Sequence, residues 1–532
     1  MIATTLNPAI FKLRHPQNPF KPTKLRYPFA AINSKAEQSK ESGTGTSRRG
    51  GAVEDNPKSG NGNGRRPPIR KSKGKRGAYG TSRKSILKKS FSQEQIFFTS
   101  PITDDPVVAI IGGGISGIVC ALALEKRGIR STVFDTGMHG LGGRLGTRTI
   151  DSQPLVFDHA AQFFTASDPR FRELVDGWLE KSLVREWNGQ IGELEAGRFI
   201  PYPSTPVKYV GVHGMRPLAD SILSQSTAAS VVRPCWISTL EPYNGMWHLS
   251  ENGKPRGQFD AIVIAHNGNL KQMAWSFPHL IVEHMVPPTG KCANRLLSLS
   301  GLPLIARQMK RLELSSIWAL LAAFEEPLSL QSHSSIPFEG AFVRGDDALS
   351  WMANNTKKLF PLQSHRPECW TFFSSAAYGK RNKVPQENIP NVTAEKVKKE
   401  MLRGVEISLG LPTGSLPQPI YTRLQLWQLP TIAGVYRGAA LPTNTPGLPC
   451  IFDPHGRAGI CGDWLLGSSV EAASLSGMAL ANHIADFIRS GGAQPEDFAV
   501  GLLDEFHPIK GHDIGQFPGL DTKEEVSAVL TM

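Results

Sequence analysis

The sequence is poor in several features that define common classes of protein. Its six cysteines include no Cys-x-x-Cys pair, and no histidine lies at zinc-finger spacing, so we expect neither a zinc site nor a thiol redox motif. A disulfide framework is not expected in a chain of 532 residues. The longest uncharged apolar run of note, Ile317–Phe324, is far too short to cross a bilayer, so no transmembrane segment is expected.

A basic excess is missing from most of the chain. The first 100 residues contain 21 Lys and Arg against 5 Asp and Glu, whereas the rest of the chain contains 38 against 41. The formal net charge of +13 therefore arises in the N-terminal segment alone. Beyond that segment the chain has no charge bias toward nucleic acid.

Acidic residues are absent from residues 1–36, where Lys and Arg lie among Thr, Pro and Ser. Such an N-terminus, with an uncharged opening and no apolar core, is more typical of a plastid transit peptide than of a mitochondrial or secretory signal. We expect residues 1–50 to be a transit peptide for the chloroplast stroma and residues 51–104 to be a disordered basic linker. The alternatives are a disordered cytosolic tail, or a basic arm that binds DNA, an anionic membrane or, through residues 48–89, RNA.

An apolar strand over residues 107–111 leads into a Gly-x-Gly-x-x-Gly turn. A helix over 118–127 and a strand over 131–134 follow, and Asp135 lies 23 residues after Gly112. In this order the helix N-terminus would receive the pyrophosphate of a dinucleotide, and the acid would bind its adenosine ribose. The alternative is a glycine-rich turn without a ligand. The residues expected to contact the dinucleotide here are Gly112, Gly114, Ile115, Ser116, Gly117 and Asp135.

A second glycine-rich loop, Gly142-Gly143-Arg144, follows the second strand. On this loop the chain resembles the flavin-dependent amine oxidase superfamily, which carries Gly-Gly-Arg followed by Ser or Thr at that place. The resemblance implies FAD as the cofactor. Gly143 would let the backbone approach the ligand, and Arg144 would balance phosphate charge or hydrogen-bond near the flavin. An unrelated turn with a surface arginine is the alternative.

The segment 157–165, which contains Asp158, Gln162 and Phe163, is similar to the Asp-x-Gly-Ala-Gln-aromatic segment of the renalase-like branch of that superfamily. The resemblance implies that Gln162 and Phe163 lie against the flavin. Ala160 replaces the family's glycine, so the backbone path can differ. Asp158 can also be a turn-capping residue only.

Near the C-terminus, a strand expected over 457–463 ends in Gly462-Asp463, and a helix rich in small residues is expected from 467 onward. By the same resemblance, Asp463 would accept a hydrogen bond from the ribityl chain and the helix N-terminus would face the cofactor; helix capping is the alternative. A strand over 258–265 would return to the nucleotide domain, and the backbone at Ile237, in a strand over 231–237, would receive the adenine.

The middle of the chain, residues 276–445, has no dinucleotide motif. Short apolar runs between Pro and Gly turns favour a mixed sheet with covering helices. Three tryptophans in segments similar to the renalase-like substrate domain are candidate pocket walls or core residues: Trp351, Trp370 and Trp427. The family tends to have basic residues just before the last of these, where this chain has Gln425 and Leu426.

No catalytic acid, base or nucleophile is defined by the sequence. His266 is more typical of a turn residue than of a catalyst. Nothing local selects Lys291 or Lys380 as the flavin-side lysine of the amine oxidases.

The sequence thus predicts an α/β fold: a Rossmann-like FAD-binding domain of the GR2, amine-oxidase type with an interleaved α+β mixed-sheet substrate domain. The FAD-binding domain is expected over 105–170, 205–275 and 450–490, the substrate domain over 171–204 and 276–449, and a tail over 491–532. The implied activity moves a hydride from a small molecule, an amine or NAD(P)H, to flavin N5, with oxygen or another acceptor reoxidising the flavin. The alternative is an FAD-bound, non-catalytic scaffold that binds partners. No oligomeric state follows.

Overall fold

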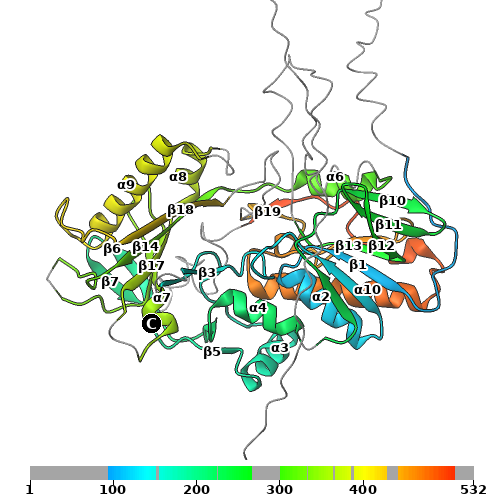
Figure 1. Ribbon diagram of the computed structural model, residues 1–532, viewed down its shortest axis with the longest axis horizontal. Coiled ribbons are helices and arrows are strands. Elements are labelled where there is room, and N and C mark those ends of the chain that lie inside the picture. Colours follow the sequence, from blue (N-terminus) through cyan, green and yellow to red (C-terminus); the bar gives the residue numbers. More distant parts are fainter. Residues whose placement is uncertain are drawn as a thin grey trace, which may run out of the picture. The chain divides into compact units, whose positions relative to one another are not determined.

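The computed structural model describes residues 94–150, 155–224, 226–266, 300–331, 334–362, 366–384, 389–427 and 441–509, all of which belong to one compact unit (Figure 1). The expected transit peptide, residues 1–50, and most of the expected basic linker lie outside the described residues.

Six strands form the first sheet. Their order is β20 (Ile451–Asp453), β21 (Ala458–Ile460), β13 (Ala261–Ile264), β1 (Val107–Ile111), β2 (Arg130–Phe134) and β9 (Ala229–Val232). Neighbouring strands are parallel except for β20, which runs antiparallel to β21. The predicted strand, turn, helix and strand are present as β1, α2 (Ile115–Lys126) and β2. Gly128 ends α2 with a left-handed φ of 77°, as its position after the helix requires.

The two faces of this sheet have separate cores because successive residues of β1 point to opposite sides. Val108 and Ile110 pack with α2 and α10 (Val470–Arg489), which lie against one another (Figure 1). Ala109 and Ile111 pack with α6 (Pro303–Arg311) and with the small sheet of β10 (Thr239–Tyr243), β11 (Met246–Glu251) and β12 (Lys254–Phe259). The nucleotide-binding half therefore has three layers.

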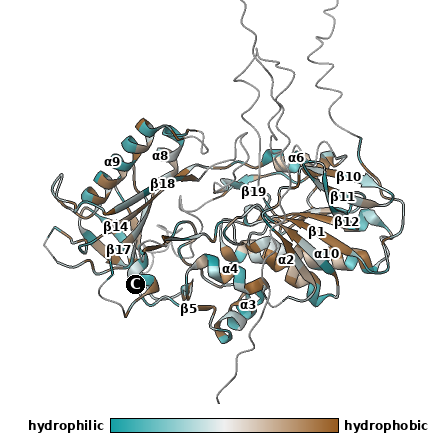
Figure 2. Ribbon diagram, viewed as in Figure 1, coloured by the Kyte–Doolittle hydropathy of each residue, from teal (hydrophilic) through white to brown (hydrophobic). Residues whose placement is uncertain are grey.

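Seven strands form the second sheet. Their order is β18 (Tyr421–Trp427), β14 (Ile317–Phe324), β17 (Glu368–Phe373), β16 (Trp351–Asn354), β15 (Gly340–Val343), β6 (Ile191–Glu195) and β7 (Arg198–Pro201). The sheet is mixed, since β15 and β6 are parallel and the other neighbours antiparallel. The apolar run noted in the sequence is β14, every residue of which is buried. Helix α9 (Asn391–Ser408) packs its apolar side on this sheet and is banded polar and apolar in Figure 2.

Shorter elements complete the fold. They are β3 (Thr147–Ile150), β4 (Leu155–Asp158), α3 (Pro169–Glu180), β5 (Val184–Glu186), β8 (Tyr209–Gly211), α4 (Met215–Leu223), α7 (Asn355–Leu359), α8 (Ala376–Arg381), β19 (Asn444–Thr445), β22 (His507–Pro508) and the 3-10 turns η1 (Asp463–Leu465) and η2 (Pro495–Phe498). Two-stranded pairs join β3 with β4, β5 with β8, and β19 with β22. The last pair returns the described part of the expected tail to the body of the fold.

The prediction that residues 51–104 form a disordered linker is wrong at its C-terminal end, because residues 94–104 pack onto the fold. The Phe98 ring contacts that of Trp247 at 5.4 Å between centroids, and the Ile96 amide donates to the Gly301 carbonyl at 2.9 Å. Thr103 donates through both its amide and its hydroxyl to the Asp260 carboxylate. The apolar residues Ile96 and Phe98 interrupt the polar composition and give this segment a surface to bury, whereas Phe97 is 59% exposed.

The expected boundaries at residues 171 and 276 are also displaced. Phe171, Val175 and Trp178 of α3 pack into the core that contains α2 and α10. Ile305 and Met309 of α6 pack on the opposite face of the six-stranded sheet. Both helices therefore belong to the nucleotide-binding half, because their apolar faces are buried there. Only β6 and β7 of residues 171–204 join the seven-stranded sheet.

Three expected strands are shorter than the sequence suggested. Of the strand expected over 457–463, only Ala458–Ile460 forms β21, and Asp463 begins the turn η1. Residues 258–265 divide at Asp260 into the ends of β12 and β13, and the Asp260 carboxylate accepts the Val107 amide at 2.9 Å. Strand β9 ends at Val232, so Ile237 lies beyond it.

In the part of the chain that the structure describes, no helix is both long and apolar enough to cross a membrane. Within the same residues, no three His, Cys, Asp or Glu side chains gather in a way that could hold a metal ion.

Candidate functional site

The carboxyl ends of four parallel strands carry most of the residues singled out from the sequence. Gly112 follows β1, Asp135 follows β2, His266 lies two residues after β13, and Gly462-Asp463 follows β21. In open α/β sheets, ligands bind at this edge, where the loops of neighbouring strands diverge.

The glycine turn is tight on one side and open on the other. A Cβ added at Gly117 would lie 2.1 Å from the Gly112 carbonyl oxygen, and one added at Gly112, whose φ is +121°, would lie 2.8 Å from the Ala265 carbonyl oxygen. A Cβ added at Gly114 would meet nothing within 4 Å. The first and third glycines therefore permit close packing of strand and helix, while the second borders open space.

The N-terminus of α2 faces that open space. The first amides of any helix have no partner within the helix, and the first turn of α2, from Ile115 through Ser116 and Gly117, contains no acidic residue. Gly114 is the N-cap and supplies no side chain to occupy these donors. The helix end can thus accept an anionic group.

Asp135 is held in place by the loops on both sides of it. Its Oδ1 accepts the Gly113 amide at 2.9 Å and its Oδ2 accepts the Gly137 amide at 2.8 Å. A carboxylate oxygen can accept more than one hydrogen bond, so Asp135 retains capacity for the two hydroxyls of a ribose.

The Gly-Gly-Arg loop lies directly against the glycine turn. The Gly142 amide donates to the Gly113 carbonyl at 2.7 Å, and a Cβ added at Gly143, whose φ is +57°, would lie 3.5 Å from the Gly114 Cα. Behind this loop, the Arg144 guanidinium forms an ion pair with the Asp463 carboxylate. The structure thus joins two predicted cofactor residues that are 319 positions apart in the chain.

Asp463 is 5% exposed and Arg144 26%. Besides the arginine, the Asp463 carboxylate accepts the Trp464 amide at 2.8 Å. The N-cap of α10 is Ser469, whose hydroxyl accepts the Ala472 amide at 2.9 Å. Asp463 therefore does not cap α10, which was the alternative interpretation of its position.

Gln162 is buried with one polar atom unsatisfied. Its Nε2 donates to the carbonyls of Asp158 at 2.8 Å and Ala160 at 2.9 Å. Its Oε1 is buried and has no hydrogen-bond partner among the described residues. Buried polar atoms usually bond to protein or to ordered water, so Gln162 Oε1 can accept a hydrogen bond from a water molecule or a ligand.

Phe163 lies in an aromatic cluster with Trp187 and Trp351, at centroid distances of 5.6 and 6.0 Å. It is 6% exposed. The segment after β4 therefore joins the nucleotide-binding half to the core of the seven-stranded sheet.

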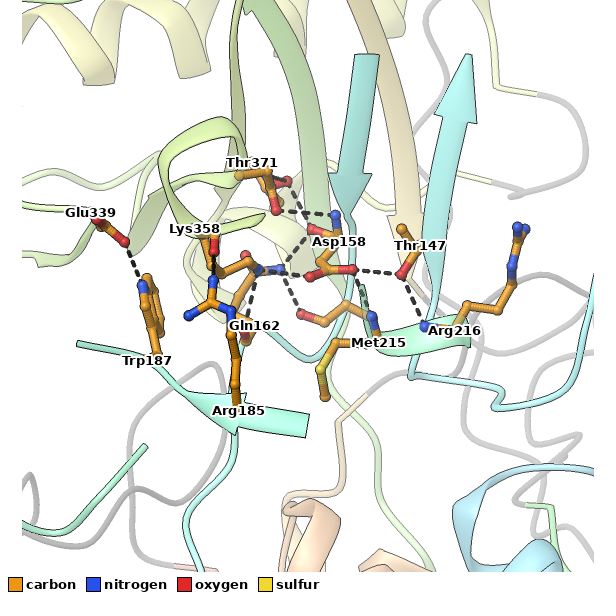
Figure 3. Close-up of polar contacts among 12 residues, drawn as sticks. Thr147, Asp158, Gln162, Arg185, Trp187, Met215, Arg216, Glu339, Lys358 and Thr371 are labelled. Carbon is orange, nitrogen blue, oxygen red and sulfur yellow. Dashed lines mark hydrogen bonds and ion pairs between the residues drawn. The ribbon is translucent and has the colours of Figure 1, made fainter. Parts of the chain in front are cut away.

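A buried ion pair stands beside this segment (Figure 3). The Oδ2 of Asp158, at the end of β4, lies 2.8 Å from the Nζ of Lys358 in α7, and both side chains are 0% exposed. The ammonium also donates to the Gln162 carbonyl at 3.2 Å. Asp158 Oδ1 accepts the Met215 amide at 3.0 Å and the Thr147 hydroxyl at 2.5 Å.

Two more buried side chains complete this network. Asn355 accepts the Asp158 amide at 3.1 Å and donates to the Thr371 hydroxyl at 2.9 Å. Thr371 in turn donates to the Asp158 carbonyl at 2.8 Å. Asp158 caps α4 from 57 positions away in sequence, so it is more than a local turn residue.

Sequence reasoning missed Lys358, Asn355 and Thr371. Lys358 follows another lysine, Lys357, and nothing in the sequence distinguishes the buried one from the one that is 38% exposed. Lys380 is exposed on α8, and Lys291 lies outside the described residues. Trp351 and Trp370 are both fully buried core residues, and the side chain of Trp427 is outside the described part.

Two histidines near the site are neutral at physiological pH. Burial, with the nearby Arg148 charge as a second cause, lowers the pKa of His159 to about 4. Burial lowers the pKa of His266 to about 4 as well. Neither side chain supplies a positive charge to the site.

Ile237 is 3% exposed in the loop between β9 and β10. The neighbouring Trp236 amide donates to the Glu251 carboxylate at 2.8 Å. The side chain is part of the core on one face of the six-stranded sheet, which leaves only its main chain as a ligand contact.

Comparison with known proteins places one match on this edge of the sheet. A family model described as an NAD(P)-binding Rossmann-like domain matches residues 110–178. This range contains the glycine turn, Asp135, the Gly-Gly-Arg loop and Gln162-Phe163. The chain contains a Rossmann-like dinucleotide-binding domain.

Two curated relatives match short stretches of the chain. Protoporphyrinogen oxidase 2, chloroplastic/mitochondrial, from Arabidopsis thaliana is 35% identical over 69 residues, which is 13% of each chain. Carotenoid phi-ring synthase from Streptomyces griseus is 52% identical over 42 residues, 8% of each chain. The chain thus matches at most 13% of the length of these relatives. The matches agree with the resemblance to the flavin-dependent amine oxidase superfamily.

Solved structures align over more of the chain at low similarity. Wild-type putrescine oxidase bound to putrescine gives a TM-score of 0.46 at 14% identity, covering 72% of this chain and 99% of that one. Cyclohexylamine oxidase from Brevibacterium oxydans gives 0.45 at 14% identity, covering 72% and 100%. Because both TM-scores are below 0.5, the fold is assigned from the strand order of the two sheets.

Proposed function

We propose that this protein is an FAD-dependent oxidoreductase of the flavin-dependent amine oxidase superfamily, renalase-like branch. The observation that carries the proposal is the convergence of the glycine turn, the Gly-Gly-Arg loop and Gly462-Asp463 at one edge of the parallel sheet. The Arg144–Asp463 ion pair links the last two.

The residues at this edge fit FAD. The open space at Gly114 and the amides of α2 would take the pyrophosphate, and Asp135 would take the adenosine ribose. Because its carboxylate is negative, Asp135 disfavours a 2′-phosphate at that place. The main chain at Ile237 would contact the adenine. The buried Gln162 Oε1 would accept a hydrogen bond from the isoalloxazine side.

Bound FAD supplies the two-electron acceptor that no side chain provides. The donor, an amine-like small molecule or a reduced nicotinamide, loses a hydride from carbon, and oxygen or another external acceptor later takes up the electrons. The chain's own contribution is to hold the cofactor, to position the donor carbon and to keep water out through the aromatic cluster of Phe163, Trp187 and Trp351.

The cofactor proposal is tested on the purified full chain. We expect yellow protein that releases FAD on denaturation. Arg144→Ala and Asp463→Ala should each lower FAD occupancy, whereas Arg130→Ala, which breaks an exposed ion pair with Asp105, should not. Colourless protein that cannot be reconstituted, or full occupancy in both site variants, would contradict the proposal.

Activity is tested by an anaerobic donor screen with NADH, NADPH and a panel of primary, secondary and tertiary amines. Bleaching of the visible flavin band by one donor class identifies the hydride source. A protein that binds FAD but is bleached by none of them is instead the non-catalytic scaffold.

We also propose import into plastids, which the acid-free N-terminus supports. Mass spectrometry of the mature protein from plastids would give its first residue. A start after about residue 90 would remove the candidate RNA-binding arm.

A further inference from the structure

The buried Asp158–Lys358 pair calls for an explanation beyond stability. Taking two charges out of water costs several kcal/mol per ion, and well-packed apolar residues in their place often stabilise a protein as much or more. Both side chains are fully buried. Retention of such a pair is therefore better explained by the geometry it imposes than by the free energy of unfolding.

The contacts of the ammonium show what that geometry is. Lys358 Nζ holds the Asp158 carboxylate at 2.8 Å and the Gln162 carbonyl at 3.2 Å, and it lies 5.7 Å from the centre of the Trp187 ring. One lysine from the short helix α7 thus holds both ends of the segment 158–162. That segment carries the buried Gln162 amide and leads into Phe163.

The lysine is itself held in place. Asn354 caps α7 through its side chain, which accepts the Lys357 amide at 3.0 Å. The Arg185 guanidinium donates to the Lys358 carbonyl (Figure 3). Because both its backbone and its ammonium are fixed, Lys358 can hold the loop after β4 in a defined place relative to the seven-stranded sheet.

We propose that Lys358 is a positioning residue that, through Asp158 and the Gln162 carbonyl, sets the place of Gln162 and Phe163 in the cofactor site. The proposal rests on the proposed function only in the claim that these two residues face the flavin. Lys358 acts through the loop and need not touch cofactor or donor.

The test compares Lys358→Met with the double variant Asp158→Asn/Lys358→Met in the full-length protein. The single variant leaves a buried carboxylate without its counter-ion, so its unfolding midpoint should fall. The double variant carries no unpaired charge, so its midpoint should return most of the way to that of the wild type. The Gln162 carbonyl still lacks its donor in the double variant. Lys380→Met, the same change at an exposed position on α8, is the matched control.

Two readouts separate positioning from stability. In flavin-free protein, amide hydrogen exchange of the peptide 159–164 should be on the order of tenfold faster in the double variant than in the wild type and the control. In FAD-loaded protein, the visible flavin band should change shape and FAD should bind on the order of tenfold more weakly, as expected for a lost charged hydrogen bond behind the contact residue. A double variant that matches the wild type in both readouts overturns the proposal. If the wild type binds no FAD, the proposed function fails, while hydrogen exchange still decides the role of Lys358.

Discussion

Two glycines of the same turn should respond to alanine in opposite ways. A Cβ at Gly117 would meet the backbone oxygen of Gly112 at 2.1 Å, and also Ala265 and Ile110 side chains at 3.1 and 3.2 Å. Because the nearest atom is backbone, the turn must open by roughly 1 Å to restore an ordinary contact. A Cβ at Gly114 would project into open space, and its φ of −72° suits any residue.

The expected magnitudes follow from these contacts. Overpacking against backbone costs about 3 kcal/mol or slightly more, and alanine recovers about 1 kcal/mol through its helix propensity. Gly117→Ala should therefore destabilise flavin-free protein by about 2 kcal/mol. Gly114→Ala loses about 0.5 kcal/mol as a poorer N-cap and gains a similar amount from a less flexible unfolded chain, so its stability should be unchanged.

FAD binding should separate the two variants again. If the pyrophosphate occupies the space beside Gly114, the methyl group of Gly114→Ala excludes it, and FAD affinity should fall at least about tenfold. The assay is denaturant unfolding of flavin-free protein together with fluorescence titration of FAD. Wild-type stability in Gly117→Ala would refute the turn geometry. Wild-type FAD affinity in Gly114→Ala would refute the placement of the pyrophosphate.

Three further changes have outcomes that the contacts determine. Gly477→Ala in α10 would place a Cβ 2.1 Å from the Ser116 carbonyl of α2, so it should cost about 2 kcal/mol in urea unfolding; an unchanged midpoint would mean that the helices can separate freely. Lys358→Met should cost about 3–5 kcal/mol, whereas Lys380→Met, at an exposed position on α8, should stay within about 0.5 kcal/mol. Burial lowers the pKa of His159 to about 4, so the unfolded state binds a proton first as the pH falls below 6.5. The free energy of unfolding should therefore fall by up to about 3 kcal/mol between pH 6.5 and 4. His159→Gln should flatten the stability profile in that window, and an unaltered slope would show that another group titrates there.

The nucleotide-binding end could be predicted from the sequence because its signals are local. A strand, three glycines, a helix and an acid follow one another within 29 residues, from Val107 to Asp135, and each has a backbone reason for its place. The apolar segment Ile96–Phe98 is also a local signal, but the basic residues that precede it led to the prediction of a disordered linker instead of a packed segment.

Other features depended on contacts between distant segments. Arg144 and Asp463 were each predicted to face the cofactor, yet only the folded sheet brings them together, 319 positions apart. The predicted boundaries between the two halves were wrong near α3 and α6. A helix belongs to the core against which its apolar face is buried, and composition does not reveal which core that is.

The sequence by itself determined the class of domain, since the spacing of the glycines and the succession of strand, turn, helix and acid are properties of one short segment. The tertiary structure alone decided which lysine is buried, because Lys357 and Lys358 are identical in type and adjacent in the chain. Lys357 is 38% exposed and pairs with Glu368, whereas Lys358 is fully buried against Asp158, and this difference arises only when α7 packs against the end of β4.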